Sequence, residues 1–237
     1  MRTLAQVDYL ALWESGRRLH PLDQGLLAVQ TAFPETRGES VADWPLGRRN
    51  RALAELQCAC FGPTLSGWTV CRQCGEKLEF QVDGQTLAQT AVGDAAEPVS
   101  VDGFCFRLPT SRDLARIADL PDAASAARRL LELCLLSRDD GEAPHAWSEQ
   151  ELDSAGEHLA LADPLAEVLL HFQCPTCNES FEESLDLAVF LWSEFEGRAK
   201  RMLLDVHTLA SAYGWSEAEV LALSPARRSF YLEMVQS

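Results

Sequence analysis

The sequence predicts a mixed α+β fold that is mainly helical, and three features carry this prediction. Apolar residues recur every three or four positions along much of the 237-residue chain, which is the spacing of a buried helix face. Shorter stretches alternate apolar and polar residues, as strands do. Two Cys-x-x-Cys motifs, Cys71–Cys74 and Cys174–Cys177, each follow an apolar stretch. Hydrophobic residues make up 47% of the chain, which is enough to bury a substantial core.

Start and stop signals place the first helices. Residues 1–16 show helical spacing, and Gly16 supplies a stop. His20-Pro21 opens a second helix, because proline favours the first helical turn. Asp43 is predicted to cap a third helix that carries Pro45 in its first turn and ends at Gly62.

The same signals divide the rest of the chain. Thr110, Ser148 and Ser216 stand at predicted helix starts, the last two as capping boxes with Glu151 and Glu219. The remaining elements are predicted as a strand through Leu78, Phe80 and Val82, a hairpin at 99–108, helices at 111–120, 122–136 and 149–162, a loop at 137–145, a long helix at 186–213, and two short helices after 216 and 225.

The two cysteine motifs match each other beyond their cysteines. An apolar stretch leads into each motif, and an aspartate, Asp83 or Asp186, follows nine residues after the last cysteine. The residue directly after that cysteine is Gly75 or Asn178, and these two residue types adopt a left-handed backbone most cheaply. We therefore predict that each motif is the knuckle of a strand–knuckle–strand hairpin, and that the two hairpins form one split zinc ribbon.

A single structural Zn²⁺ is the predicted ligand of Cys71, Cys74, Cys174 and Cys177. Four thiolates close the tetrahedron and leave no position for substrate, so such a site supports structure and performs no chemistry. The half-sites are about 100 residues apart, so the metal would close a long loop. A redox-active pair is the alternative, but such a pair usually opens a helix, whereas alternating residues follow the first motif.

The motifs also divide the chain into segments of one composite domain. We predict an N-terminal helical segment at 1–63, the first knuckle hairpin at 64–84, an inserted hairpin with helices at 85–166, the second knuckle hairpin at 167–185, and C-terminal helices at 186–237. Cys58 and Cys60, at the end of the third helix, are predicted to be small buried side chains rather than spare metal ligands.

Charge and cysteine usage restrict the partners and the compartment. With 20 basic and 36 acidic residues the formal charge is −16, which argues against nucleic acid or an anionic membrane as the main partner and favours proteins. Eight cysteines and an N-terminus unlike a secretory signal favour the reducing cytoplasm. The longest apolar run, Leu187 to Trp192, is too short to cross a bilayer.

No catalytic motif is recognisable in the sequence, and we predict that the protein is not an enzyme. A phosphate-binding glycine loop, a nucleophile elbow and a His-Glu-x-x-His helix are all missing. A zinc-dependent transcriptional regulator is the alternative function. Ala210, Gly214 and Val220 have the spacing of a helix-turn-helix, but the helix that would read DNA carries Glu217 and Glu219, which would repel phosphate.

Several segments resemble one family. Residues 104–114, the second cysteine motif and residues 206–228 are similar to the baseplate proteins or baseplate hub assembly chaperones, of the T-even type, that are encoded with phage tails and phage-tail-like contractile injection particles. The likeness extends over nearly the whole chain, and Asn178 replaces the glycine expected after the second motif. The resemblance implies a non-enzymatic cytoplasmic role in building the baseplate, or incorporation into the released particle, with baseplate, hub or tail-tube proteins as partners.

Two clusters of side chains are candidates for contacting such partners. Near the C-terminus, Arg227, Arg228, Phe230 and Tyr231 are predicted either to form a docking patch or to pack against the long helix. On the third helix the basic cluster at 48–51 could grip an acidic surface, but we interpret it as solvated charge.

Overall fold

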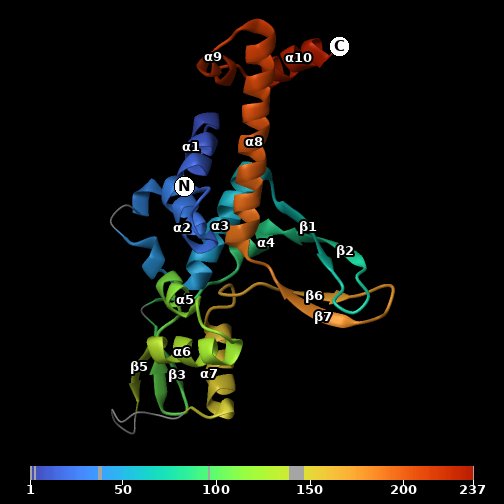
Figure 1. Cartoon of the computed structure of the whole chain (residues 1–237). Helices are drawn as coiled ribbons and strands as arrows, with labels where there is room; N and C mark the ends of the chain where they lie inside the picture. The colour runs from blue at the N-terminus through green and yellow to red at the C-terminus, as the bar shows by residue number, and fades with distance from the viewer. Residues whose placement is uncertain (1, 3, 37–38, 96, 139–146, 237) are drawn as a thin grey trace.

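The computed structural model describes residues 2, 4–36, 39–95, 97–138 and 147–236, and the chain is a mainly helical α+β protein with small antiparallel sheets. Figure 1 shows three parts: a helical body, an arm of two hairpins that projects from the side of the body, and a lobe below it. None of the described helices is both long enough and apolar enough to cross a membrane.

The body is formed by α1 (Gln6–Gly16), α2 (Pro21–Ala32), α3 (Leu46–Phe61) and the first half of α8 (Leu187–Tyr213). Phe195 of α8 is fully buried, and its ring contacts the rings of Tyr9 and Phe61 at centroid distances of 5.6 and 5.2 Å. The second half of α8 extends beyond the body and carries α9 (Glu217–Leu221) and α10 (Pro225–Gln236) (Figure 1).

Two helix starts differ from the predictions. The first helix begins at Gln6, and the third begins at Leu46, after two 3-10 turns at Pro34–Thr36 and Val41–Asp43. Asp43 therefore does not cap α3, and its carboxylate binds Arg112 instead. The physical reason is Pro45, which forces the residue before it out of the helical region; Trp44 is extended, with φ −71° and ψ 147°.

The lobe has a hydrophobic core of its own. A three-stranded antiparallel sheet in the order β3 (Val99–Val101), β4 (Phe104–Phe106) and β5 (Leu135–Arg138) packs with α6 (Ala123–Cys134) and α7 (Glu149–Ala162). The lobe also includes α5 (Ser111–Ile117). The predicted loop at 137–145 is wrong at its start, because Ser137 and Arg138 pair with β4; residues 139–146 lie outside the described part of the chain.

Buried polar contacts join the lobe to the body. Asp163, which is 1% exposed, accepts hydrogen bonds from the backbone N–H groups of Gly47 (2.8 Å) and Gly93 (3.0 Å). Arg49 donates to the Oγ of Ser111 at 3.1 Å and to the Oδ1 of Asn50. Arg49 is only 7% exposed, so the prediction of solvated charge is wrong at this member of the basic cluster.

Gly47→Ala is expected to destabilise the joint between lobe and body by about 1–3 kcal/mol, the usual cost of overpacking a buried site. A Cβ at Gly47 would lie 1.9 Å from the carboxylate oxygen of Asp163. Gly156→Ala in α7 is the matched control: its Cβ meets no atom within 4 Å, so the change should stabilise the helix by about 0.5–1 kcal/mol. Urea unfolding of both variants measures the difference, and equal effects would contradict the close contact.

The arm consists of hairpin β1–β2 (Thr64–Val70, Lys77–Asp83) and hairpin β6–β7 (Leu169–Gln173, Ser180–Ser184), which confirms the predicted strands on both sides of each motif. An aspartate at or just after the end of each hairpin caps the next helix: Asp83 caps α4 (Gly84–Gln89) and Asp186 caps α8. The sequence did not predict α4. At the root of the arm, Leu65 is fully buried in the core of the body.

Candidate metal centre

The two Cys-x-x-Cys turns have the same backbone geometry. Cys71 follows β1, its N–H donates to the carbonyl of Glu76 at 2.8 Å, and its carbonyl accepts from the N–H of Gly75 at 2.9 Å. The N–H of Cys174 donates to Glu179 at 2.8 Å, and its carbonyl accepts from Asn178 at 2.9 Å. Both residues after the second cysteine are left-handed as predicted, with φ 77° at Gly75 and 60° at Asn178.

These turns bring all four cysteine sulfurs together. The Sγ atoms of Cys71 and Cys177 are 3.6 Å apart, and those of Cys74 and Cys174 are 3.5 Å apart. All four Sγ atoms lie within 4.8 Å of one another, so the cluster could hold a metal ion. Cys71 and Cys174 are buried, Cys177 is half-buried and Cys74 is exposed.

The distances fit a shared metal ion better than disulfides. A disulfide places its sulfurs at about 2.0 Å, and all eight cysteines here are free. Four sulfurs at about 2.3 Å from one tetrahedral Zn²⁺ would be about 3.8 Å from one another, close to the separations of 3.5 and 3.6 Å across the hairpins. Both of these pairs join one hairpin to the other, so a bound metal would connect the two halves of the arm.

The electrostatics of the cluster also suit a cation. The backbone N–H groups of Cys177 and Thr176 point at the sulfur of Cys174 and lower the pKa of its thiol to about 7. At Cys177 the N–H of Glu179 lowers the pKa, but burial and the hydrogen bonds with the other three cysteines outweigh it and raise the pKa to about 12. Crowded thiols thus resist ionising together, and a divalent cation removes that penalty as it displaces their protons.

Two polar contacts and an aromatic contact join the hairpins around the cluster. Arg72 in the first turn donates to Glu183 at 2.8 Å, and Thr176 in the second turn donates to Glu76 at 3.2 Å. The rings of Phe80 and Phe172 meet edge to face at 5.8 Å between the inner faces of the hairpins. This contact area is small, so a metal would be the main connection at the far end of the arm.

The other sequence-predicted candidates lie away from this centre. Cys58 and Cys60 do not join the group of four and are half-buried rather than buried. His20 caps α2 by accepting a hydrogen bond from the N–H of Leu22 at 3.2 Å. Trp68 and Val70, which lead into the first motif, lie on the outer, exposed face of β1. Trp68 and Val70 pair with Glu79 and Lys77 across the hairpin. These two polar residues alternate with the inward Leu78 and Phe80 along β2, and this alternation is the sequence signal that could have placed Trp68 and Val70 on the outer face.

The predicted partner-binding residues on α10 divide into two groups. Arg228 is 5% exposed and is held within the chain by Asp205 and Gln6. The ring of Tyr231 packs against the ring of Trp215 at 4.9 Å. Arg227 and Phe230 are exposed and line a hollow of about 330 Å³, so they are the part of the predicted patch that a partner can reach.

The helix-turn-helix-like corner is a packed junction. Gly214 ends α8 in the left-handed conformation, with φ 70°, and Val220 is fully buried. The following helix, α9, spans five residues, and its first turn carries Glu217 and Glu219. A helix this short and acidic does not favour contact with a phosphate backbone.

No family model, curated protein or solved structure matches this chain.

Proposed function

We propose that the chain is a non-enzymatic zinc-binding protein that assists assembly of, or forms part of, the baseplate of a contractile phage tail or related injection system. The observation that carries the zinc part is the convergence of four cysteine sulfurs from two hairpins. An all-thiolate tetrahedral shell favours zinc, or iron in an iron–sulfur site, over harder cations. In such a site every coordination position of the metal is filled by a protein ligand, which suits a structural role.

The assembly part of the proposal is supported by the sequence resemblance and by the surface. The chain carries a formal charge of −16, which favours protein partners over nucleic acid or anionic lipid. It exposes Phe230 at 62% and Leu204 at 63%, on the two helices that extend furthest from the body. These two side chains support the proposal to the extent that they belong to a contiguous apolar surface, which is what marks a docking site.

Metal analysis tests the zinc assignment directly. Native mass spectrometry and elemental analysis of the purified chain are expected to give one zinc per chain. The double variant Cys71→Ser with Cys174→Ser should bind none, because each half-site loses the thiolate of its buried cysteine. Stoichiometric iron with no zinc would contradict the assignment, and so would zinc retained by the double variant.

Co-purification tests the assembly role. A tagged chain expressed from its own locus in the native host is expected to recover tail-tube, hub or baseplate proteins. Recovery of only polymerase or DNA, together with salt-sensitive specific DNA binding in vitro, would favour the regulator instead. Insulin reduction that survives removal of the metal would favour a thiol oxidoreductase.

A further inference from the structure

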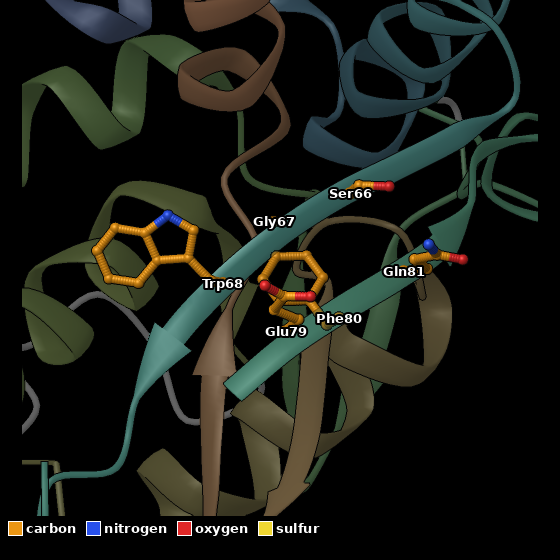
Figure 2. Close-up of a pocket in the computed structure, with 6 residues that line it drawn as sticks. All are labelled: Ser66, Gly67, Trp68, Glu79, Phe80 and Gln81. Atoms are coloured by element: carbon orange, nitrogen blue, oxygen red, sulfur yellow. The ribbon is translucent and has the colours of Figure 1, made fainter. Parts of the chain in front are cut away.

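Hairpin β1–β2 presents apolar side chains on the face that points to solvent. Trp68 is 60% exposed and Val70 is 41% exposed. Their cross-strand neighbours on this face are Glu79 and Lys77, respectively. Figure 2 shows the Trp68 indole standing clear of the β1 ribbon. A hollow of about 470 Å³ adjoins it and is lined by Ser66, Gly67, Trp68, Glu79, Phe80 and Gln81. Tryptophan is enriched among the residues that contribute most to protein–protein binding.

The second hairpin provides an internal comparison for this face. Trp68 and His171 each stand three residues before the first cysteine of a motif, and Glu79 and Glu182 each stand five residues after the last. In hairpin β6–β7 the opposed pair is His171 and Glu182, whose Nδ1 and Oε1 atoms are 2.9 Å apart. In hairpin β1–β2 the pair is Trp68 and Glu79, and no described side chain binds the Glu79 carboxylate. Glu79 therefore lacks the partner that the imidazole provides to Glu182, and its exposed carboxylate can pair with an external cation.

The Trp68 ring already interacts with one cation. The Nζ of Lys77 lies 4.8 Å from the ring centroid, which is within the range of a cation–π interaction. An indole has two faces, so a second cation can stack on the face that Lys77 does not cover.

The net negative charge of the arm also favours a cationic ligand. Residues 64–84 and 167–185 contain seven carboxylates and two basic side chains. Arg72 is bound to Glu183, and Lys77 lies over Trp68, so both basic side chains already have a contact within the arm. A field of this sign attracts positively charged segments and repels phosphate.

We propose that the outer face of hairpin β1–β2 docks a partner protein through an extended segment in which an arginine or lysine stands two residues from an apolar side chain, so that both point to the same face. The cation of that segment pairs with Glu79 and stacks on Trp68, while the apolar side chain covers Val70, two residues further along β1. The docking requires a folded arm, and therefore the metal, but it does not require that the partner belong to a baseplate.

The test uses the metal-loaded full chain and two synthetic peptides whose charged and valine side chains share one face when extended, Ac-Arg-Ser-Val-Ser-Arg-Ser-Val-NH₂ (the arginine peptide) and Ac-Glu-Ser-Val-Ser-Glu-Ser-Val-NH₂. Isothermal titration at low salt is expected to detect binding of the arginine peptide only. Glu79→Gln and Trp68→Ala should each weaken that binding about fivefold to tenfold. Two control variants on the side of hairpin β6–β7 should each weaken the binding by less than about twofold. Glu167→Gln removes the same charge from an exposed position, and Leu169→Ala removes an exposed apolar side chain.

The controls distinguish a site from general attraction between a cationic peptide and an acidic protein. Equal weakening by Glu79→Gln and Glu167→Gln would overturn the proposal, as would a failure of the arginine peptide to bind. Each variant is also assayed for its metal. A variant that loses peptide binding and keeps its metal has lost docking alone. If the wild-type chain bound the peptide without any metal, the claim that the arm needs its metal to fold would be wrong, and the docking face would still stand.

Discussion

Chelating the metal from the purified chain is expected to unfold the arm while the helical body keeps its structure. Each hairpin is an isolated two-stranded sheet within the described chain. Around the cysteine cluster the hairpins are joined by the ring contact of Phe80 with Phe172 and by two hydrogen bonds, from Arg72 to Glu183 and from Thr176 to Glu76. Two-stranded hairpins are marginal in water by themselves. Structural zinc contributes about 10–16 kcal/mol of binding free energy in small zinc domains, so an arm with zinc in its cysteine cluster would depend on the metal far more than on these contacts.

Hydrogen exchange measures this difference segment by segment. Amides of β1, β2, β6 and β7 are expected to exchange at least about 100-fold faster in the metal-free chain. Amides of α3 and of the first half of α8 should change by less than about threefold, because their core of buried leucine and aromatic side chains is independent of the cluster. Leu65 is anchored in that core, so protection should persist longest at the root of the arm.

A matched cysteine variant controls for the chemistry of the substitution. Cys58→Ser with Cys105→Ser removes two half-buried thiols that lie outside the cluster, and should leave both metal content and arm exchange unchanged. Arm amides that remained equally protected without metal would show that the hairpins hold together unaided, and the metal would then have no structural role.

The cysteine cluster could be predicted from sequence because its signals are local. Cysteine spacing fixes which two sulfurs one turn can aim at a common point, and Gly75 and Asn178 mark the left-handed residue that closes each turn. The matching residues on both sides of the two motifs indicated that the two turns are copies of one another, and the structure confirms that their four sulfurs come together. The capping boxes at Ser148 and Ser216 are confirmed for the same reason, since a cap is read from four consecutive residues.

Two of the failures are contacts between distant segments, whereas the shifted start of α3 has a local cause in Pro45. β5 (Leu135–Arg138) exists because it pairs with β4. Its two leucines continue the apolar pattern of the preceding helix, and nothing in the local sequence indicates a strand whose partner lies about 30 residues earlier. Arg49 is buried because Ser111 and Asn50 accept its hydrogen bonds, whereas its neighbours on the same helix suggested a solvated cluster. Both errors have the same cause: tertiary contacts override local preference.

Asp113→Ala is expected to destabilise the lobe by about 3 kcal/mol, near the lower end of the cost of breaking a buried ion pair. The side chain of Asp113 is 1% exposed, and its two oxygens accept from the two terminal nitrogens of Arg107 at 2.7 and 2.8 Å. Arg107 also donates to the carbonyl of Leu133 at 2.8 Å, so the pair connects α5 to the end of α6. Removing the carboxylate leaves a guanidinium that is 31% exposed, and partial solvation of that charge keeps the cost at the low end.

The pH dependence of the wild-type chain gives the same pair a second readout. Burial by itself raises the pKa of Asp113, but the hydrogen bonds from Arg107 and Thr110 outweigh it and hold the pKa below its ordinary value of 3.8. The stability from this pair is therefore complete above pH 3.8 and is lost as the pH falls through the lowered value. Urea unfolding should show wild type and Asp113→Ala converging in that acidic window.

Asp122→Ala separates the ion pair from an ordinary helix cap. Asp122 is exposed and caps α6 by accepting from the N–H of Ser125 at 2.8 Å, so its loss should cost only about 1 kcal/mol. A double-mutant cycle with Arg107→Ala isolates the direct coupling between Arg107 and Asp113. If Asp113→Ala costs no more than Asp122→Ala, or if the cycle gives no coupling, the pair does not hold the lobe together, and the rigid support from α5 to α6 must come from the hydrophobic core around Phe106 alone.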